Sequence, residues 1–287
     1  MKTKTEVTAL VTTCDRYDTT LPLCLMSIIN QTYKPNRIIL VDDNQEKKFY
    51  DYEILRNILI LCKYKDIKFD YFYGPSKGCT YALDLGLKKI EQGWILKVDD
   101  DNVLEPNILE LYVKNISDNV GVMGGLIIDN DSLTRGWDIQ KNEYNRLCDV
   151  YSVWNVQMIT NQSTDIKEVE HVYSNYFFKK DETIVPDLRL TPSCHREDTI
   201  FTYQYFKKGY KLLVIPESKT YHLNYAESTG DNRHSIDSFI KNEMIFIDKL
   251  KEWEIVPQEF EIIEEEHQFV TGNSKTGKQD GYLVFRK

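Results

Sequence analysis

Residues Trp94 to Asn102, W-I-L-K-V-D-D-D-N, join a short apolar segment directly to three consecutive carboxylates. An apolar run of this length is typical of one fully buried strand in a parallel sheet. Asp99, Asp100 and Asp101 follow at its carboxyl end, where two like charges about 4 Å apart repel by about 4 kcal/mol at an intermediate dielectric. The stretch therefore predicts a site for a hard divalent cation. The alternative is a solvated acidic turn that caps the following helix.

The residues before this stretch alternate between strand-like and helix-like patterns. Strands are expected at Val7–Thr13, Arg37–Val41 and Phe69–Tyr73, and apolar helical spacing follows each of them. This alternation over the first 125 residues predicts an α/β fold with a mostly parallel, doubly wound central sheet flanked by helices. Ligands of such sheets bind outside the carboxyl ends of the strands. One crevice should therefore collect residues 12–16, 42–43, 77–78 and 99–101.

Composition bounds the class of protein. The chain has 287 residues, of which 41% are hydrophobic and 12% aromatic, so it can bury one large core or two modest ones. Its net charge of -9 and its lack of a basic stripe argue against a nucleic-acid partner. If the chain binds a phosphorylated ligand, part of the positive charge should come from a metal held by the aspartates.

The six cysteines, at positions 14, 24, 62, 79, 148 and 194, form no C-x-x-C pair and show no zinc-type spacing with histidine. Reduced thiols in a cytoplasm are the simplest interpretation. The amino-terminal residues contain no apolar targeting segment, and no apolar run approaches the roughly 20 residues of a membrane span. We therefore expect a cytoplasmic protein that is neither secreted nor membrane-spanning.

The motifs of the first 125 residues together resemble the nucleotide-binding half of family 2 glycosyltransferases, which have the GT-A fold. They are T-T-C-D-R-Y from Thr12, L-x-S-I-I-N-Q-T-Y from Leu25, I-I-L-V-D-D-N from Ile38, G-C-T-Y-A-L from Gly78, and V-D-D-D-N from Val98. The resemblance implies a nucleoside-diphosphate sugar donor, most often a UDP-sugar, bound with Mn²⁺ or Mg²⁺.

The same resemblance implies roles for individual residues. Thr12 and Arg16 would line the nucleotide pocket, and Asp43, together with Asp42, would accept a hydrogen bond from the base. Lys77 would lie against donor groups.

In the family's D-x-D pattern, Asp99 would touch the ribose or sugar and Asp101 would bind the metal. The additional carboxylate of Asp100 leaves the register open, so Asp100 is also a candidate donor ligand and Asp99 a candidate metal ligand. Cys14 stands where the family commonly has an aromatic residue.

A second group of motifs follows Cys194. The run C-H-R-E-D precedes an expected helix to about Lys208, then a strand at Leu212–Ile215, Pro216 and finally Tyr221-His222. This order also resembles the family and implies that Asp198, or else Glu197, is the catalytic base and His222 a metal ligand. Acidic residues in a first helical turn also have a purely structural explanation in the helix dipole.

His195 is a rival base because an unperturbed imidazole titrates near neutral pH. For the metal, the imidazole nitrogen of His222 together with two carboxylates suits Mn²⁺ better than Mg²⁺.

The remaining segments carry weaker expectations. Strands are expected at Gly121–Ile128 and Val169–Phe178, and residues 129–165 are a candidate acceptor surface unless their aromatics only cover the sheet. Trp137, Tyr144, Tyr151 and Trp154 are those aromatics. Residues 225–234 are expected to form either a mobile lid or a plain surface loop.

The domain organisation expected is a glycosyltransferase domain at 1–230, divided into a donor half (1–128) and an acceptor and catalytic half (129–230). Residues 231–287 would add an amphipathic helix near 235–253 and a tail. The tail could form a hairpin, a homo-oligomer contact or a partner site.

The expected function is an inverting, metal-dependent glycosyltransferase that acts on a hydroxyl of a saccharide or glycolipid. Polysaccharide or glycolipid assembly, with peripheral association at the inner face of the membrane, is implied by the family resemblance alone. A sugar-phosphate nucleotidyltransferase is one alternative, although it should have a glycine-rich phosphate loop near the amino terminus, and residues 7–16 contain no glycine. A catalytically inactive nucleotide-binding scaffold is the other.

Overall fold

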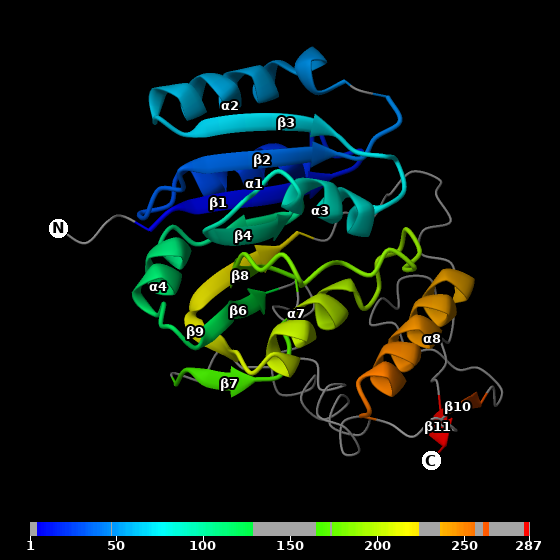
Figure 1. Cartoon of the computed structure of the whole chain (residues 1–287). Helices are drawn as coiled ribbons and strands as arrows, with labels where there is room; N and C mark the ends of the chain where they lie inside the picture. The colour runs from blue at the N-terminus through cyan, green and yellow to red at the C-terminus, as the bar shows by residue number, and fades with distance from the viewer. Residues whose placement is uncertain are drawn as a thin grey trace.

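The computed structural model describes residues 5–46, 48–128, 165–172, 174–223 and 236–255, and the backbone of 261–263 and 284–286. Within this part of the chain, nine strands form one sheet in the order β3-β2-β1-β4-β8-β6-β9-β5, with β7 also paired to β9 (Figure 1). Its strands are β1 (Val7–Thr13), β2 (Arg37–Asp42), β3 (Lys68–Tyr73), β4 (Trp94–Asp99), β5 (Asn102–Leu104), β6 (Val120–Ile128), β7 (Lys167–Val169), β8 (Tyr176–Lys179) and β9 (Lys211–His222).

The amino-terminal half of the sheet is parallel, as predicted. β1 lies between β2 and β4 and pairs with both in parallel, and β3 pairs in parallel with β2. The carboxyl ends of these strands therefore meet at one edge. The other half joins through β8, which is antiparallel to both β4 and β6.

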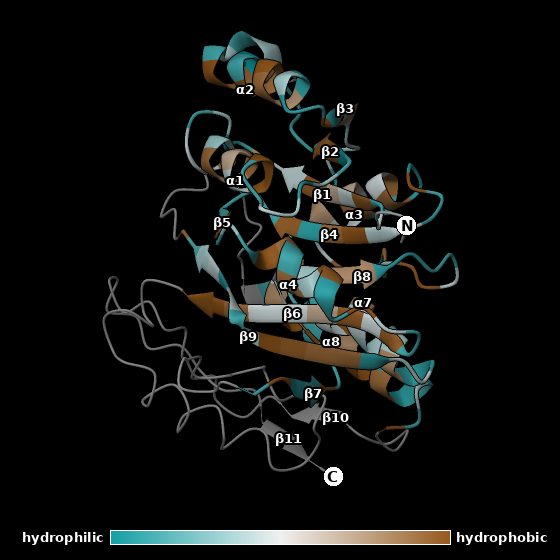
Figure 2. Ribbon diagram, turned by 90° about the vertical axis from the view of Figure 1, so that its left-hand side faces the viewer, coloured by the Kyte–Doolittle hydropathy of each residue, from teal (hydrophilic) through white to brown (hydrophobic). Residues whose placement is uncertain are grey.

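Helices cover both faces of the sheet (Figures 1 and 2). The alternation of side chains along β1 explains why: Val7, Ala9 and Val11 enter the core that includes residues of α1, α2 and α4, whereas Leu10 enters the core with α3 and α7. The helices are α1 (Thr20–Ile29), α2 (Glu53–Tyr64), α3 (Cys79–Leu87), α4 (Ile108–Lys114), α7 (Glu197–Lys207) and α8 (Ile236–Glu252), with a short 3-10 turn η1 (Phe49–Asp51).

The expected carboxyl-terminal helix is present as α8. It packs against α7 in a third apolar cluster that contains Ile200, Tyr203 and Phe246. β10 (Glu261–Ile263) and β11 (Val284–Arg286) pair antiparallel, as a hairpin in the tail would. Among the described helices, none is long and apolar enough to cross a membrane.

Two strand predictions are corrected. The single strand expected at Val169–Phe178 is two strands, β7 and β8, with irregular backbone between them. The strand expected to stop at Ile215 continues through Pro216 to His222. Proline is tolerated there because the β6–β9 register shifts between the pairs Gly124↔Val214 and Leu126↔Lys219, so Pro216 lies in the irregular part of the ladder.

The long strand β9 has a direct consequence for the functional residues. Its last residues pair antiparallel with β5, so that Asn102 lies opposite His222. The aspartate triplet and a histidine more than 100 residues away are thereby placed side by side. The candidate acceptor aromatics and the candidate lid at 225–234 lie outside the described residues.

Candidate active site

The aspartate triplet sits where β4 ends and the chain turns into β5. Asp99 is the last residue of β4, and Asp100 and Asp101 form the turn. The backbone of this turn is tied to β9, because Leu223 N–H donates to Asp101 O at 2.8 Å. The acidic turn leads directly into β5, so it does not cap a helix directly.

Arg16 neutralises part of this charge. Its Nη1 lies 2.5 Å from Asp101 Oδ2 and 3.6 Å from Asp100 Oδ1. Asp100 Oδ2 in turn accepts a hydrogen bond from Thr13 Oγ1 at 2.7 Å. The loop after β1 and the loop after β4 are thus joined at the carboxyl edge of the sheet, as the sequence predicts.

The three carboxyl groups differ in their electrostatics. Burial raises the pKa of Asp100 to about 7, although Arg16 opposes the shift. Burial also raises the pKa of Asp99, against the effect of Lys97. Asp101 behaves in the opposite way, because His222 and then Arg16 outweigh its burial and lower its pKa. Asp101 is therefore the carboxylate of the triplet that most favours the ionised, metal-ligating form.

Lys97 joins the triplet to helix α7. Its Nζ lies 2.7 Å from Asp99 Oδ1 and 3.0 Å from Asp198 Oδ1, and its side chain is only 3% exposed. Asp198 Oδ2 also accepts the backbone N–H of Ser174 at 2.8 Å. Asp198 is consequently oriented by two donors next to Asp99, while its side chain keeps 20% of its surface exposed.

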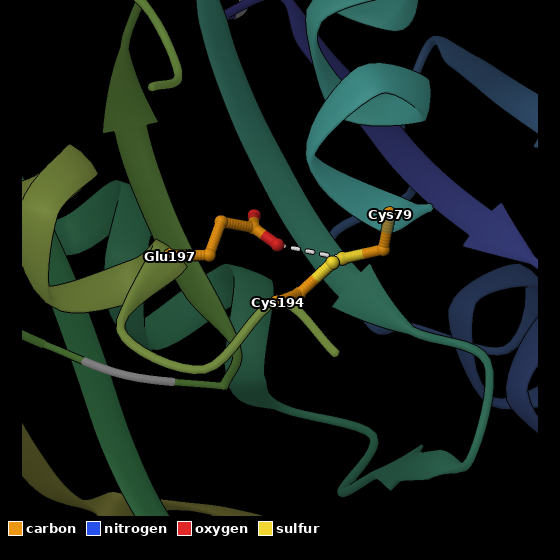
Figure 3. Close-up of side chains that lie close together, drawn as sticks. All are labelled: Cys79, Cys194 and Glu197. Carbon is orange, nitrogen blue, oxygen red and sulfur yellow. Dashed lines mark hydrogen bonds between the residues drawn. The ribbon is translucent and has the colours of Figure 1, made fainter. Parts of the chain in front are cut away.

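The two other base candidates point elsewhere. Glu197 is buried, and its Oε2 accepts from the Cys79 thiol (Figure 3). His195 Nε2 lies 2.5 Å from Glu243 Oε1, and Arg196 also pairs with Glu243. Of the three, Asp198 alone shares a partner with the aspartate triplet.

The thiols beside Glu197 perturb each other. A hydrogen bond with Cys79 lowers the pKa of Cys194 to about 7, and the same hydrogen bond together with burial raises the pKa of Cys79. Burial raises the pKa of Glu197 well above its usual value.

The carboxylates after β2 are held by the protein. Asp42 is fully buried, and its oxygens accept from Tyr17, Tyr71 and Asn44. Asp43 accepts backbone N–H groups of the loop before α3, from Ser76 at 2.8 Å and from Gly78 at 2.7 Å. Both residues shape the loop that would face a nucleotide, and their base contacts stay predictions.

The two remaining donor candidates differ in exposure. Thr12 is 7% exposed and pairs in the ladder with Asp99 and Val41. Lys77 is exposed, with its ammonium 5.4 Å from the centre of the Tyr81 ring. The donor contacts of both residues also stay predictions.

Comparison with known proteins identifies the family. The model of "Glycosyl transferase family 2" matches residues 8–182, more than half of the chain. The chain belongs to glycosyl transferase family 2. A curated relative, an uncharacterized glycosyltransferase of Rickettsia bellii (strain RML369-C), is 30% identical over 93 residues, which are 32% of this chain and 12% of the relative.

Solved structures resemble this family 2 chain in fold. TarS of S. aureus is 14% identical with a TM-score of 0.56, over 85% of this chain and 40% of TarS. GalNAc-T7, solved with UDP, GalNAc and Mn²⁺, is 17% identical with a TM-score of 0.59, over 90% of this chain and 52% of GalNAc-T7. The mannosyltransferase PcManGT from Pyrobaculum calidifontis, solved with GDP-Man and Mn²⁺, is 15% identical with a TM-score of 0.56, over 86% of this chain and 65% of that enzyme. The GT-A fold predicted from the sequence is confirmed.

The residues of this family 2 chain fit a divalent metal at Asp101 and His222. His222 Nε2 lies 3.5 Å from Asp101 Oδ2, and Asp101 Oδ1 is buried without a hydrogen-bond partner among the described residues. A carboxylate and an imidazole are ligands that Mn²⁺ accepts. Asp99 is turned toward Lys97, Asn102 and Ser174, so its part in metal binding stays a prediction.

Sequence reasoning missed two contributors to the site of this family 2 chain. Lys97 is a charged residue within an otherwise apolar strand, which was the available signal for a buried ion pair. Ser174, which orients Asp198, lies between β7 and β8 where no motif marks it.

Proposed function

We propose that this chain is an inverting, metal-dependent glycosyltransferase that uses a nucleoside-diphosphate sugar, namely a UDP-sugar, as donor. The single observation that supports this most strongly is the convergence of three separate segments at one sheet edge. Asp101, in the turn after β4, lies next to His222 at the end of β9. Two residues earlier, Asp99 shares the Lys97 ammonium with Asp198 at the start of α7. The family and the fold support the proposal that this edge is the donor side.

In the proposed mechanism, Asp198 removes the proton of the acceptor hydroxyl as its oxygen attacks the anomeric carbon of the donor. Lys97 and the Ser174 N–H hold the two Asp198 oxygens and fix the direction of the carboxylate. A single displacement with a carboxylate base inverts the anomeric centre and needs no covalent sugar intermediate. Mn²⁺ or Mg²⁺ held by Asp101 and His222 would stabilise the charge that develops on the departing diphosphate.

Arg16 acts on the donor side in this proposal. Its guanidinium pairs with Asp101 and Asp100 and offsets part of the repulsion between them. Thr12, Asp43 and Lys77 would complete the nucleotide pocket. Asp42 would support that pocket through Tyr17 and Tyr71.

The acceptor we propose is a hydroxyl of a saccharide or glycolipid, reached in the cytoplasm or at the inner face of the membrane. Residues 1–230 would form the transferase domain and 231–287 an extension. The packing of α8 on α7 supports a structural role for the first part of that extension.

Calorimetric titration with UDP, GDP, CDP and dTDP, each with Mn²⁺, with Mg²⁺ and with EDTA, tests the donor site. The expected result is metal-dependent binding of one nucleotide, which then selects the sugar donors for a nucleotide-release assay. Release of pyrophosphate from a nucleoside triphosphate would instead support a nucleotidyltransferase. Binding of nucleotide without any transfer would support the inactive scaffold.

A further inference from the structure

Three side chains, those of Cys79, Cys194 and Glu197, lie close together at the starts of two helices (Figure 3). Cys79 is the first residue of α3, Glu197 is the first residue of α7, and Cys194 precedes α7 by three residues. One donor atom from each lies within 4.8 Å of the other two. Within the described ranges, no other group of three histidine, cysteine, aspartate or glutamate side chains meets this spacing.

Glu197 gives a second, independent indication of a ligand. Its residue is only 4% exposed, and its Oε1 is buried with no hydrogen-bond partner among the described residues. A buried carboxylate oxygen without a partner has lost its hydration and gained no hydrogen bond in return, which is unfavourable. A cation between this carboxylate and the two sulfurs would remove that cost.

The backbone around the cluster is already in place. A Cβ on Gly78 would lie 2.7 Å from Pro192 Cα, so the segments before α3 and α7 are in direct contact. Cys194 N–H donates to Thr191 O at 2.9 Å, and Glu197 N–H donates to Cys194 O at 3.0 Å. The three ligands therefore project from fixed backbone, and only their side chains need to adjust.

We propose that Cys79, Cys194 and Glu197 bind one divalent ion of the zinc class, at a site separate from the Asp101–His222 site. Two thiolates and one carboxylate favour Zn²⁺ or Cd²⁺ over Mg²⁺ and Mn²⁺, because sulfur ligands are soft. Two metal–sulfur bonds and one metal–oxygen bond form, and the protons of the thiols pass to solvent. A fourth position stays open for water, as in three-ligand zinc sites.

The geometry of the cluster agrees with this ion after a small expansion. Cys79 Sγ lies 2.6 Å from Glu197 Oε2, whereas ligands of a tetrahedral zinc ion, with bonds of about 2.0–2.3 Å, lie roughly 3.5 Å apart. The ion replaces a tight thiol contact and moves the two atoms apart. Lys97 adds positive charge close enough to influence both Cys79 and Glu197, so it balances part of the excess negative charge.

The bound ion would connect the start of α3 to the start of α7, where Asp198 follows Glu197 directly. Glu197 is then a positioning residue and not a second base. The site itself stands whether or not the transferase proposal is correct, because its readout is metal binding.

Titration of the reduced, metal-free full chain with Cd²⁺ tests the site, with excess Mg²⁺ present to occupy oxygen-ligand sites. The expected result is an ultraviolet thiolate-to-cadmium absorption that saturates at one ion per chain and is reversed by Zn²⁺. Cys79→Ser and Cys194→Ser should each weaken binding by about tenfold or more, and Glu197→Gln should weaken it in the same direction. Cys62→Ala, at a buried thiol of α2, and Asp101→Asn should leave the titration unchanged.

The proposal would be overturned if the native chain showed no such absorption, or if both serine variants absorbed as strongly as the native chain. If a variant fails to fold, alkylation of the cysteines in the native chain tests the same metal site. Zn²⁺ should slow modification of Cys79 and Cys194 but not of Cys14, as measured by peptide mass spectrometry. Unchanged alkylation rates for Cys79 and Cys194, or a disulfide between them that forms with peroxide equally fast with and without Zn²⁺, would also refute it.

Discussion

Lys97 Nζ lies 3.0 Å from Asp198 Oδ1, a contact between β4 and α7 that spans 101 residues of sequence. The same ammonium lies 2.7 Å from Asp99 Oδ1. Burial alone would lower the pKa of Lys97, but Asp198 and then Asp99 outweigh it and raise the pKa well above its usual value. Lys97 is therefore a buried cation that holds the donor half and the proposed catalytic helix together.

Replacing Lys97 with methionine should destabilise the chain by about 3–5 kcal/mol, because two carboxylates would lose their shared cation in a buried position. Urea unfolding followed by circular dichroism measures this change. Lys68→Met is the matched control, since Lys68 pairs with Asp70 on β3 but its side chain is 65% exposed, and the change should stay below about 1 kcal/mol. Equal effects of the two substitutions would contradict the role given to Lys97.

Asp198→Asn should lower kcat by about 10²–10⁴-fold while nucleotide binding stays within a few-fold, because the amide cannot accept the acceptor proton. Nucleotide release gives kcat, and calorimetry gives donor affinity. His195→Gln is the comparison. This variant should retain most of the turnover, since the His195 side chain is turned toward Glu243. A larger loss in His195→Gln than in Asp198→Asn would move the base to His195.

Asp101→Asn should abolish the metal dependence of nucleotide binding. The reason is that Asp101 is the carboxyl group of the triplet whose pKa is lowered, and its Oδ2 lies 3.5 Å from His222 Nε2. Titration of UDP with and without Mn²⁺ measures the difference. Retained metal dependence would exclude Asp101 as the metal ligand.

Arg16→Gln should lower the thermal unfolding midpoint in EDTA. Addition of Mn²⁺ should restore most of the lost midpoint. Without the guanidinium, Asp100 and Asp101 repel each other until a metal replaces the lost charge. Differential scanning calorimetry in the two buffers measures the effect. The expectation fails if Mn²⁺ stabilises the variant no more than it stabilises the native chain.

Glu243 predicts a pH dependence of stability. Burial would raise its pKa, but Arg196 and then His195 outweigh burial and lower the pKa to about 2. Because the folded pKa lies below the unfolded value near 4.5, the stabilisation is complete above pH 4.5 and is lost as the pH falls toward 2. The contribution is at most about 3 kcal/mol.

Glu243→Gln should therefore reduce stability at neutral pH and flatten its fall between about pH 4.5 and 2. Urea unfolding at several pH values gives both quantities. Glu252→Gln serves as the control because the Glu252 side chain is 49% exposed. A slope that is unchanged in Glu243→Gln would show that other carboxylates control acid unfolding.

The amino-terminal half could be read from the sequence because its information is local. Apolar strands such as Trp94–Val98, helical spacing between them and polar residues at each strand end suffice to predict a parallel sheet with ligands at one edge. The first three strands pair with their neighbours in the sequence, and β4 returns to pair with β1, so all four strands run parallel.

The carboxyl-terminal half was harder to predict because its strands are not all parallel. β8 enters the sheet antiparallel between β4 and β6, and β9 continues past Pro216 through a register shift. No local sequence pattern predicts the antiparallel direction of β8 or the register shift of β9, since both depend on pairing with strands far away in the sequence.

The sequence by itself pointed to the aspartate triplet, the E-D pair and His222 as candidate groups of the site. Only the tertiary structure separated Asp198, which shares Lys97 with Asp99, from Glu197, which turns to Cys79 and Cys194. Adjacent residues in a first helical turn point about 100° apart, so a one-residue step decides which neighbours a carboxylate contacts. Those neighbours come from β4 and α3, which long-range packing brings together with α7 and which the linear pattern does not place.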